Sequence, residues 1–235
     1  MSDRFALEVV RVGKRYIAHG RDQVALHDVS VGVPRSTLVA VAGPSGSGKS
    51  TLLSIIGCLA RPDAGSVVFD GVDVTALSRA RRRTLRRDLL TNLLPQPSDN
   101  LLQRESGYGN LRRSHRGTVP TTDEMTERLD RFGIAHCGPK RVVDMSGGEQ
   151  QRLALVCALA RTPSLVVADE PTSSLDRANA ALVIDALRRA VDLGATIVVA
   201  THDRDLIDAS SAAVHLAHGV VVALDGFPSS AGDAR

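Results

Sequence analysis

Residues 38–51 read LVAVAGPSGSGKST and decide the fold. The first five are apolar and are bounded by Gly43-Pro44, which predicts a short strand buried on both faces of a sheet. From Lys49 the apolar residues recur on one stripe that runs to Leu59, which predicts a helix. Residues 43–50 match G-x-x-x-x-G-K-[ST] in full, in the strand–loop–helix context that this motif requires. The stretch therefore predicts an α/β core that carries a phosphate-binding loop.

The residue types of this loop suit a nucleoside triphosphate. Glycines permit positive φ, so backbone N–H groups can point inward around phosphate oxygens, and the helix N-terminus adds a partial positive charge. Lys49 would reach the β- and γ-phosphates, and the Ser50 hydroxyl would sit on Mg²⁺. The nucleotide-binding candidates here are Gly43, Ser45, Gly46, Gly48, Lys49, Ser50 and Thr51.

The sequence on either side of this loop extends the prediction. Residues 5–12 and 24–33 alternate like strands, with a turn-like segment at 19–22 between them. After Ser146, helical patterns at 149–159 and 177–192 alternate with buried strands at 165–168 and 195–200, a last strand follows at 220–224, and this alternation indicates parallel strands with crossovers. Residues 95–145 are more polar and predict an inserted, mostly helical or irregular subdomain, with 126–132 as its clearest helix.

Two carboxylates form a second candidate site. Residues 165–170 read LVVADE, so Asp169 and Glu170 follow a buried strand at the sheet edge where parallel sheets bind ligands. Asp169 can hold Mg²⁺ through water. Glu170 can orient or deprotonate an attacking water.

Residues 146–149, SGGE, have two interpretations. As local structure they form a capping box, with Ser146 as N-cap and Glu149 three residues into the helix. That interpretation does not explain Gly147 and Gly148, which weaken a helix but expose its N–H groups to an anion. A chain with two phosphate-binding helix starts either binds two phosphates or shares one nucleotide with another copy.

Residues 145–152, MSGGEQQR, resemble the signature motif of ABC ATPases, the nucleotide-binding subunits of ABC transporters. The resemblance runs from about residue 5 to 225. It implies a P-loop NTPase core with a mainly parallel sheet, an N-terminal antiparallel β-subdomain and an inserted α-helical subdomain. We expect one domain over 1–225, with the catalytic core at 1–95 and 150–225, the helical subdomain at about 96–149, and a disordered tail at 226–235.

The resemblance also assigns residues that no local pattern identifies. Tyr16 is similar to the aromatic that stacks on adenine, although a half-buried strand tyrosine is the plain alternative. Gln96 resembles the switch glutamine that touches Mg²⁺ and the attacking water, but Leu94-Pro95 precede it where an aromatic is usual. Asp176 lies in a segment like the loop that crosses the dimer interface, and His202 resembles the catalytic switch histidine.

In such ATPases two copies pack head to tail and hold ATP and Mg²⁺ between the phosphate loop of one and Ser146, Gly147 and Gly148 of the other. The resemblance therefore implies a homodimer, or a heterodimer with a second ABC ATPase, that drives an integral membrane permease from the cytoplasmic face of the membrane. The sequences of the three motifs resemble those of the macrolide-exporter and lipoprotein-releasing subgroup. A soluble ABC ATPase working on DNA or ribosomes is the alternative, as is a non-hydrolysing nucleotide-binding module, although Glu170 and His202 argue against the latter.

Composition narrows the partners. Aromatic residues make up 3% of the 235 and the net charge is +3, so we expect no stacking platform for single-stranded nucleic acid and no nucleic-acid partner. The three cysteines lack metal-ligand spacing and predict free thiols. Residues 79–87 contain six arginines, which indicates either a solvated helix face or a surface for anionic lipid or a partner.

Overall fold

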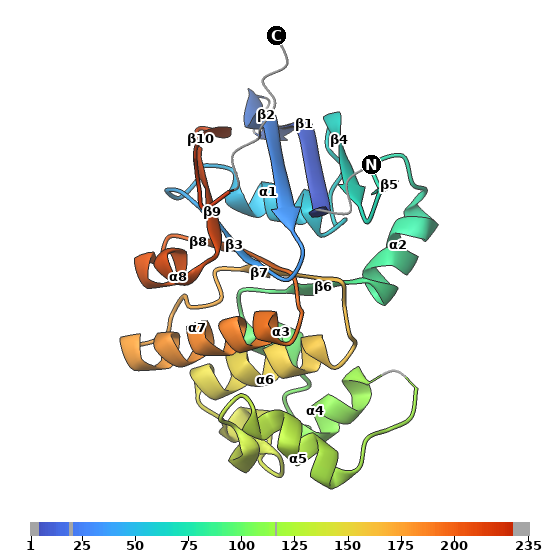
Figure 1. The fold of residues 1–235 in the computed structure, drawn as a ribbon, viewed down its shortest axis with the longest axis vertical. Coiled ribbons are helices and arrows are strands. Elements are labelled where there is room, and N and C mark those ends of the chain that lie inside the picture. Colours follow the sequence, from blue (N-terminus) through green and yellow to red (C-terminus); the bar gives the residue numbers. More distant parts are fainter. Residues whose placement is uncertain (1–4, 19–20, 116, 228–235) are drawn as a thin grey trace.

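The computed structural model describes residues 5–18, 21–115 and 117–227. Figure 1 shows an antiparallel sheet at one end, a second sheet in the middle and the helices α4 and α5 at the other end. No helix within the described ranges has the length and apolar character needed to cross a bilayer. The chain has the architecture that the resemblance implied, an α/β core with an antiparallel N-terminal sheet and a helical insertion.

The antiparallel sheet has the strand order β2-β1-β4-β5. Its strands are β1 (Phe5–Ala18), β2 (Arg21–Pro34), β4 (Ala64–Phe69) and β5 (Val72–Asp73). The predicted strands 5–12 and 24–33 were too short, because β1 and β2 stay paired through Tyr16 opposite Gln23 to Ala18 opposite Arg21. Residues 21 and 22 of the expected turn belong to β2, and residues 19 and 20 lie outside the described ranges.

The second sheet has the order β10-β9-β3-β8-β7-β6. Its strands are β3 (Leu38–Ala42), β6 (Leu90–Leu93), β7 (Leu165–Asp169), β8 (Ile197–Thr201), β9 (Ala212–Ala217) and β10 (Val220–Asp225). Five strands run parallel, and β10 pairs with β9 antiparallel. The carboxyl ends of β3, β7 and β8 therefore meet at one edge, which is where the phosphate loop and both carboxylates emerge.

Strand β3 is buried on both faces, as predicted. Leu38 and Ala40 belong to the core cluster that includes α6 and α7, whereas Val39 and Val41 belong to the cluster between this sheet, α1 and the antiparallel sheet. This alternation divides the molecule into two apolar cores on the two sides of one sheet.

The helices largely follow the predicted positions. They are α1 (Lys49–Ile56), α2 (Arg79–Asp88), α3 (Pro97–Asn100), α4 (Gly107–Ser114), α5 (Thr122–Asp130), α6 (Gly147–Leu159), α7 (Arg177–Asp192) and α8 (Arg204–Ala209), with 3₁₀ turns at Ala135–Cys137 and Val142–Asp144. The α7 bounds match the prediction. The stripe that begins at Lys49 was expected to include Leu59, but α1 ends at the cap Gly57 and the Leu59 side chain is exposed.

The insertion is more ordered than its polar sequence suggested. α5 begins at Thr122, four residues before the predicted start, because the Thr121 side chain caps it. Leu111, Met125 and Leu129 are fully buried and join the core cluster that contains α6 and α7. A few well-placed apolar side chains thus suffice to attach this subdomain to the core.

Candidate functional site

The phosphate loop connects β3 to α1 in the conformation that its glycines allow. Gly43 has φ 152° and Gly48 has φ 104°, both in the region that favours glycine. A Cβ at Gly43 would collide with the Leu216 carbonyl oxygen, and one at Gly48 would collide with the Ala25 carbonyl oxygen. Any larger residue at either position would therefore displace the loop from β9 or β2.

Lys49 lies across its own loop. Its Nζ donates to the carbonyl oxygens of Gly43 (2.9 Å) and Pro44 (3.1 Å), and lies 3.8 Å from a carboxylate oxygen of Glu170. The side chain is only 8% exposed. A buried ammonium held by two neutral carbonyls is a group that an incoming phosphate can attract, because an anionic oxygen is the stronger acceptor.

A turn that the sequence reasoning missed clamps this loop. Gly219, between β9 and β10, donates its N–H to the Ser47 carbonyl (3.0 Å) and accepts the His27 N–H (2.8 Å). His218 and Gly219 both have positive φ, the geometry of a tight hairpin turn. The signal was the His218-Gly219 pair between two apolar runs, of which only the second was identified.

The two carboxylates occupy different environments at the end of β7. Asp169 Oδ1 is buried and has no hydrogen-bond partner among the described residues. Glu170 has a positive φ of 48°, and its N–H donates to the Ala200 carbonyl (2.9 Å), which turns its side chain out of the strand. The His202 Nδ1 lies 3.0 Å from a Glu170 carboxylate oxygen, so the predicted base and the predicted switch histidine touch.

These groups surround one cavity of about 710 Å³. It brings together nine of the residues predicted from the sequence: Tyr16, Ser45, Gly46, Gly48, Lys49, Ser50, Thr51, Glu170 and His202. Tyr16 is half-exposed, with the Lys14 ammonium 5.4 Å from its ring centroid. The lining therefore includes both an aromatic ring, which suits a base, and a phosphate-binding loop.

Other lining residues were not predicted, and several predicted residues do not line the cavity, among them Gly43, Gln96, Asp169 and Asp176. Gln23, Val24 and Ala25 from β2 contribute to its wall, as do Pro95 and Ser173. Gln96 is exposed and precedes α3, where its backbone carbonyl accepts from the Asp99 N–H at 3.0 Å and from the Asn100 side chain at 3.1 Å. In this conformation Pro95 lines the cavity and Gln96 does not.

The capping box at the start of α6 is confirmed. The Ser146 Oγ accepts the Glu149 N–H at 3.3 Å, and the Glu149 carboxylate accepts the Ser146 N–H at 2.6 Å. Burial opposes ionisation of Glu149, but hydrogen bonds from His136, Ser146 and Lys140 outweigh it and lower the pKa of this carboxyl to about 2. Glu149 is therefore ionised at neutral pH and stabilises the first turn of α6.

The glycines of this segment differ in their surroundings. A Cβ at Gly148 would collide with the Asn179 side chain, which donates to Asp176 at 2.7 Å. Gly147 is exposed, and a Cβ there would only touch Leu175. Gly148 thus has a packing reason to be glycine, and Asp176 is placed as the N-cap of α7. Ser146, Gly147 and Gly148 do not line the cavity of their own chain.

A cluster of three side chains of the kinds that can bind a metal lies beside this cap. One ligand atom each of His136, Cys137 and Glu149 fall within 4.8 Å of one another. Burial and the neighbouring Glu149 raise the pKa of the Cys137 thiol to about 11, which favours the protonated form. Because the Glu149 carboxylate already accepts from Ser146 and Lys140, we assign this group to the cap. All three cysteines are free, as predicted, and the structure buries them.

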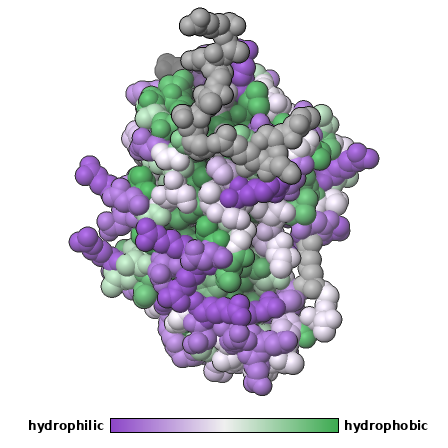
Figure 2. Space-filling model, viewed as in Figure 1, coloured by the Kyte–Doolittle hydropathy of each residue, from purple (hydrophilic) through white to green (hydrophobic). Residues whose placement is uncertain are grey.

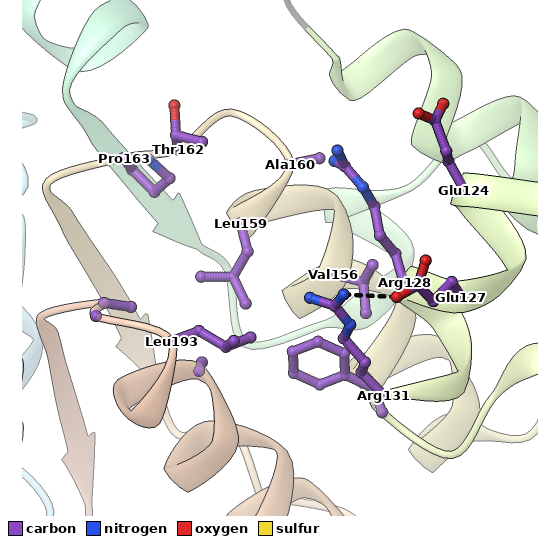
Figure 3. A pocket seen from close by; sticks show the side chains of 14 residues that line it. Glu124, Glu127, Arg128, Arg131, Val156, Leu159, Ala160, Thr162, Pro163 and Leu193 are labelled. Atoms are coloured by element: carbon purple, nitrogen blue, oxygen red, sulfur yellow. Dashed lines mark hydrogen bonds and ion pairs between the residues drawn. The ribbon is translucent and has the colours of Figure 1, made fainter. Parts of the chain in front are cut away.

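Another cavity, of about 610 Å³, lies between α5, α6 and the end of α7 (Figure 3). Leu159 and Leu193 form part of its apolar floor, and Arg128 lies on its rim beside the ion pair of Arg131 with Glu127 (2.7 Å). None of the site residues predicted from the sequence lines it.

Comparison with known proteins identifies the family. A family profile described as ABC transporter matches residues 26–173. The chain is 36% identical to the phosphate import ATP-binding protein PstB 2 of Natronomonas pharaonis, over 92% of this chain and 78% of that one. It is 31% identical to the macrolide export ATP-binding/permease protein MacB of Burkholderia pseudomallei, over 97% of this chain but only 37% of that protein.

Solved structures agree. An ATP-binding cassette in a dimeric post-hydrolysis state, bound to ADP and Pi, superposes with a TM-score of 0.79 at 29% identity and covers 94% of this chain and 99% of its own. The cbiO1 protein of Clostridium perfringens, part of an ABC transporter complex, gives a TM-score of 0.82 at 25% identity over 95% of this chain and 89% of its own. The chain is therefore an ATP-binding, ATP-hydrolysing subunit of the ABC transporter family.

Proposed function

We propose that two copies of this chain hold ATP between the phosphate loop of one and Ser146, Gly147 and Gly148 of the other, and that hydrolysis drives a membrane permease. One observation carries the proposal. Lys49, Glu170 and His202 converge on one cavity, whereas the second candidate anion site does not line that cavity. The two sites can share one nucleotide only if the second comes from another chain, either an identical copy or a second ABC ATPase.

The chemistry assigned to each side chain follows from its contacts. Lys49 exchanges its two carbonyl contacts for phosphate oxygens and neutralises charge there. Glu170 accepts a proton from the attacking water, whose oxygen bonds to the γ-phosphorus as the bond to the bridging oxygen breaks. His202, already 3.0 Å from Glu170, fixes that carboxylate and senses the γ-phosphate.

The cation site is argued from this chain's own donors. Asp169 has a buried oxygen with no hydrogen-bond partner among the described residues. Ser50, in the first turn of α1, lines the cavity. Hydroxyl and carboxylate oxygens are the ligands that Mg²⁺ prefers, so these residues fit the ion. Gln96 would join them only by moving toward the cavity. When bound, Mg²⁺ neutralises phosphate charge and polarises the γ-phosphoryl group.

The partner and its location belong to the same proposal. The solved cassette most relevant here is a dimer, and the macrolide relative is described as an ATP-binding/permease protein. The chain spans 37% of that relative, and in our proposal the permease lies outside these 235 residues. The chain would dock on the cytoplasmic face of the membrane, with no nucleic acid as partner.

The exporter subgroup is proposed from the motif resemblance alone. Relatives of both kinds match the chain, including phosphate and methionine importers and macrolide and pyoverdine exporters. Their names therefore do not favour one direction of transport.

The test is steady-state phosphate release by the parent chain and by Glu170→Gln, with ATP binding measured on both. The amide keeps the shape of the side chain but cannot take a proton, so turnover should fall at least ~10²-fold while ATP affinity is kept. Equal turnover in the two proteins would refute the role of Glu170.

A further inference from the structure

Helix α2 (Arg79–Asp88) concentrates the positive charge of the molecule. It holds six Arg and one Asp, while the whole chain has 29 Lys and Arg against 26 Asp and Glu. The rest of the chain therefore carries a formal net charge of −2. The nucleotide cavity does not use this helix, since none of its residues lines that cavity.

The six arginines divide into two groups. Arg82 and Arg86 donate to the carbonyl oxygens of Ala60 and Cys58, at 3.4 and 2.6 Å, and so attach the helix to the end of α1. Arg87 forms a two-bond pair with Asp88. The side chains of Arg79, Arg81 and Arg83 are exposed and make no ion pair with any described residue; we name these three the arginine ridge.

The arginine ridge is electrostatically unfavourable within the chain alone. Arg79 and Arg83 lie one turn apart on the same face, where like charges repel, and the positive end of the helix dipole adds to the repulsion at Arg79 and Arg81. No acidic residue stands in the first turn of α2. Burial, together with the charges of Arg61, Arg86 and Arg79, lowers the pKa of Arg82, which shows the same repulsion on the anchoring side. A layer of negative charge would relieve it.

The position of the ridge and the residues around it indicate which kind of anionic partner it can bind. In the view of Figure 1, α2 lies at the right-hand edge of the molecule, and Figure 2 shows hydrophilic side chains projecting from that edge. α2 has no buried residue. Between Arg79 and Arg86 the residues outside the ridge are Ala80, Arg82, Thr84 and Leu85. Protein interfaces owe most of their binding energy to Trp and Tyr as well as Arg, and α2 has no aromatic residue to accompany its arginines. A laterally mobile array of phosphates needs only exposed, flexible cations.

We propose that the arginine ridge binds the anionic headgroups of the membrane in which the permease sits, and so orients the cassette against the bilayer. The inference rests on the proposed function, because only a cassette attached to a permease meets that surface. Basic residues near an anionic membrane surface each contribute roughly a fivefold gain in partitioning, and the attraction weakens within a Debye length as salt rises.

The test is cosedimentation of the full chain with vesicles of phosphatidylglycerol and phosphatidylcholine, and with vesicles of phosphatidylcholine alone. The parent should bind the first and not the second, with affinity falling as salt is raised. Arg79→Gln, Arg81→Gln and Arg83→Gln together should lower binding about 100-fold, while the corresponding three Arg→Lys changes should retain most of it. The matched control, Arg104→Gln, Arg112→Gln and Arg161→Gln, removes three exposed charges outside α2 and should change binding less than about fivefold.

Several outcomes would overturn the inference. These are equal binding by the parent and the ridge variant, equal losses in the ridge and control variants, and equal binding to both kinds of vesicle. A ridge variant that binds vesicles normally but no longer copurifies with the permease would assign the ridge to that protein instead. Phosphate release keeps the two proposals separate: normal turnover without vesicle binding refutes only the ridge, and vesicle binding without turnover refutes only the catalytic proposal.

Discussion

Replacing Ser146 by alanine tests whether this residue only caps α6 or also contacts a shared nucleotide. The chain contains a matched control for the cap. In α5 the Thr121 Oγ accepts the Glu124 N–H at 3.3 Å, and the Glu124 carboxylate accepts the Thr121 N–H at 2.7 Å. The Ser146 and Glu149 distances are 3.3 and 2.6 Å. Ser146→Ala and Thr121→Ala therefore remove almost the same hydrogen bond from two exposed caps.

Ser146→Ala and Thr121→Ala should lower stability equally, but only Ser146→Ala should lower turnover. Loss of either cap should cost about 1 kcal/mol of unfolding free energy, or roughly 2–4 °C in Tm for a chain of this size. The Ser146 Oγ accepts the Glu149 N–H, and its hydroxyl proton, which faces the Glu149 carboxylate in this state, can turn toward a phosphate. If that proton is donated to the γ-phosphate bound by the partner copy, its removal should lower turnover by about 10²–10³-fold. Thr121→Ala should leave turnover unchanged.

The assay is thermal unfolding, ATP binding by the separated monomer, and phosphate release, all on the same preparations. We expect equal losses of Tm, unchanged ATP affinity, and loss of turnover in Ser146→Ala alone. Normal turnover in Ser146→Ala, with Tm lowered as in Thr121→Ala, would mean that Ser146 is only a cap and would refute the shared site.

Further expected outcomes follow from single contacts. Lys49→Ala should weaken ATP binding itself at least ~10-fold, since a charge-assisted contact to phosphate is lost; unchanged affinity in a titration contradicts this. Asp169→Asn should raise the Mg²⁺ concentration needed for half-maximal turnover, and an unaltered Mg²⁺ titration argues against its role as a ligand. Glu149 has its pKa lowered from 4.5 to about 2, so the stability it contributes is present above about pH 4.5 and is lost as pH falls toward 2. The difference in urea unfolding free energy between the parent and Glu149→Gln should therefore shrink on acidification, and a difference independent of pH would contradict the assigned hydrogen bonds.

Most of the site residues that the sequence predicted can be identified from a few neighbouring residues, whereas Tyr16 and His202 were assigned by the family resemblance alone. The phosphate loop depends on glycines whose φ values and close contacts leave no alternative, and Glu170 follows a strand that is apolar throughout. The α6 cap was readable because a capping box spans only four residues. Predictions of this kind need the chain only over one turn or one strand.

The parts that were missed depend on distant segments. The Gly219 turn matters because it reaches Ser47, 172 residues earlier in the chain, and nothing local marks that contact. The β2 residues that line the cavity are brought there by pairing of β2 with β1. The arrangement at Gln96 was missed for the opposite reason: the resemblance predicted its role, whereas local contacts of its backbone carbonyl with Asp99 and Asn100 accompany its position outside the cavity lining.

The central claim is that two copies share ATP between the phosphate loop of one and Ser146 of the other. Sedimentation velocity of Glu170→Gln tests it most directly, because a chain that binds ATP without hydrolysing it should accumulate the shared state. The account predicts dimers with ATP, monomers with ADP or without nucleotide, and weaker ATP-dependent dimers when Ser146→Ala is added to the same chain. Glu170→Gln that binds ATP yet stays monomeric at every protein concentration, or dimers that form equally well without nucleotide, would contradict it.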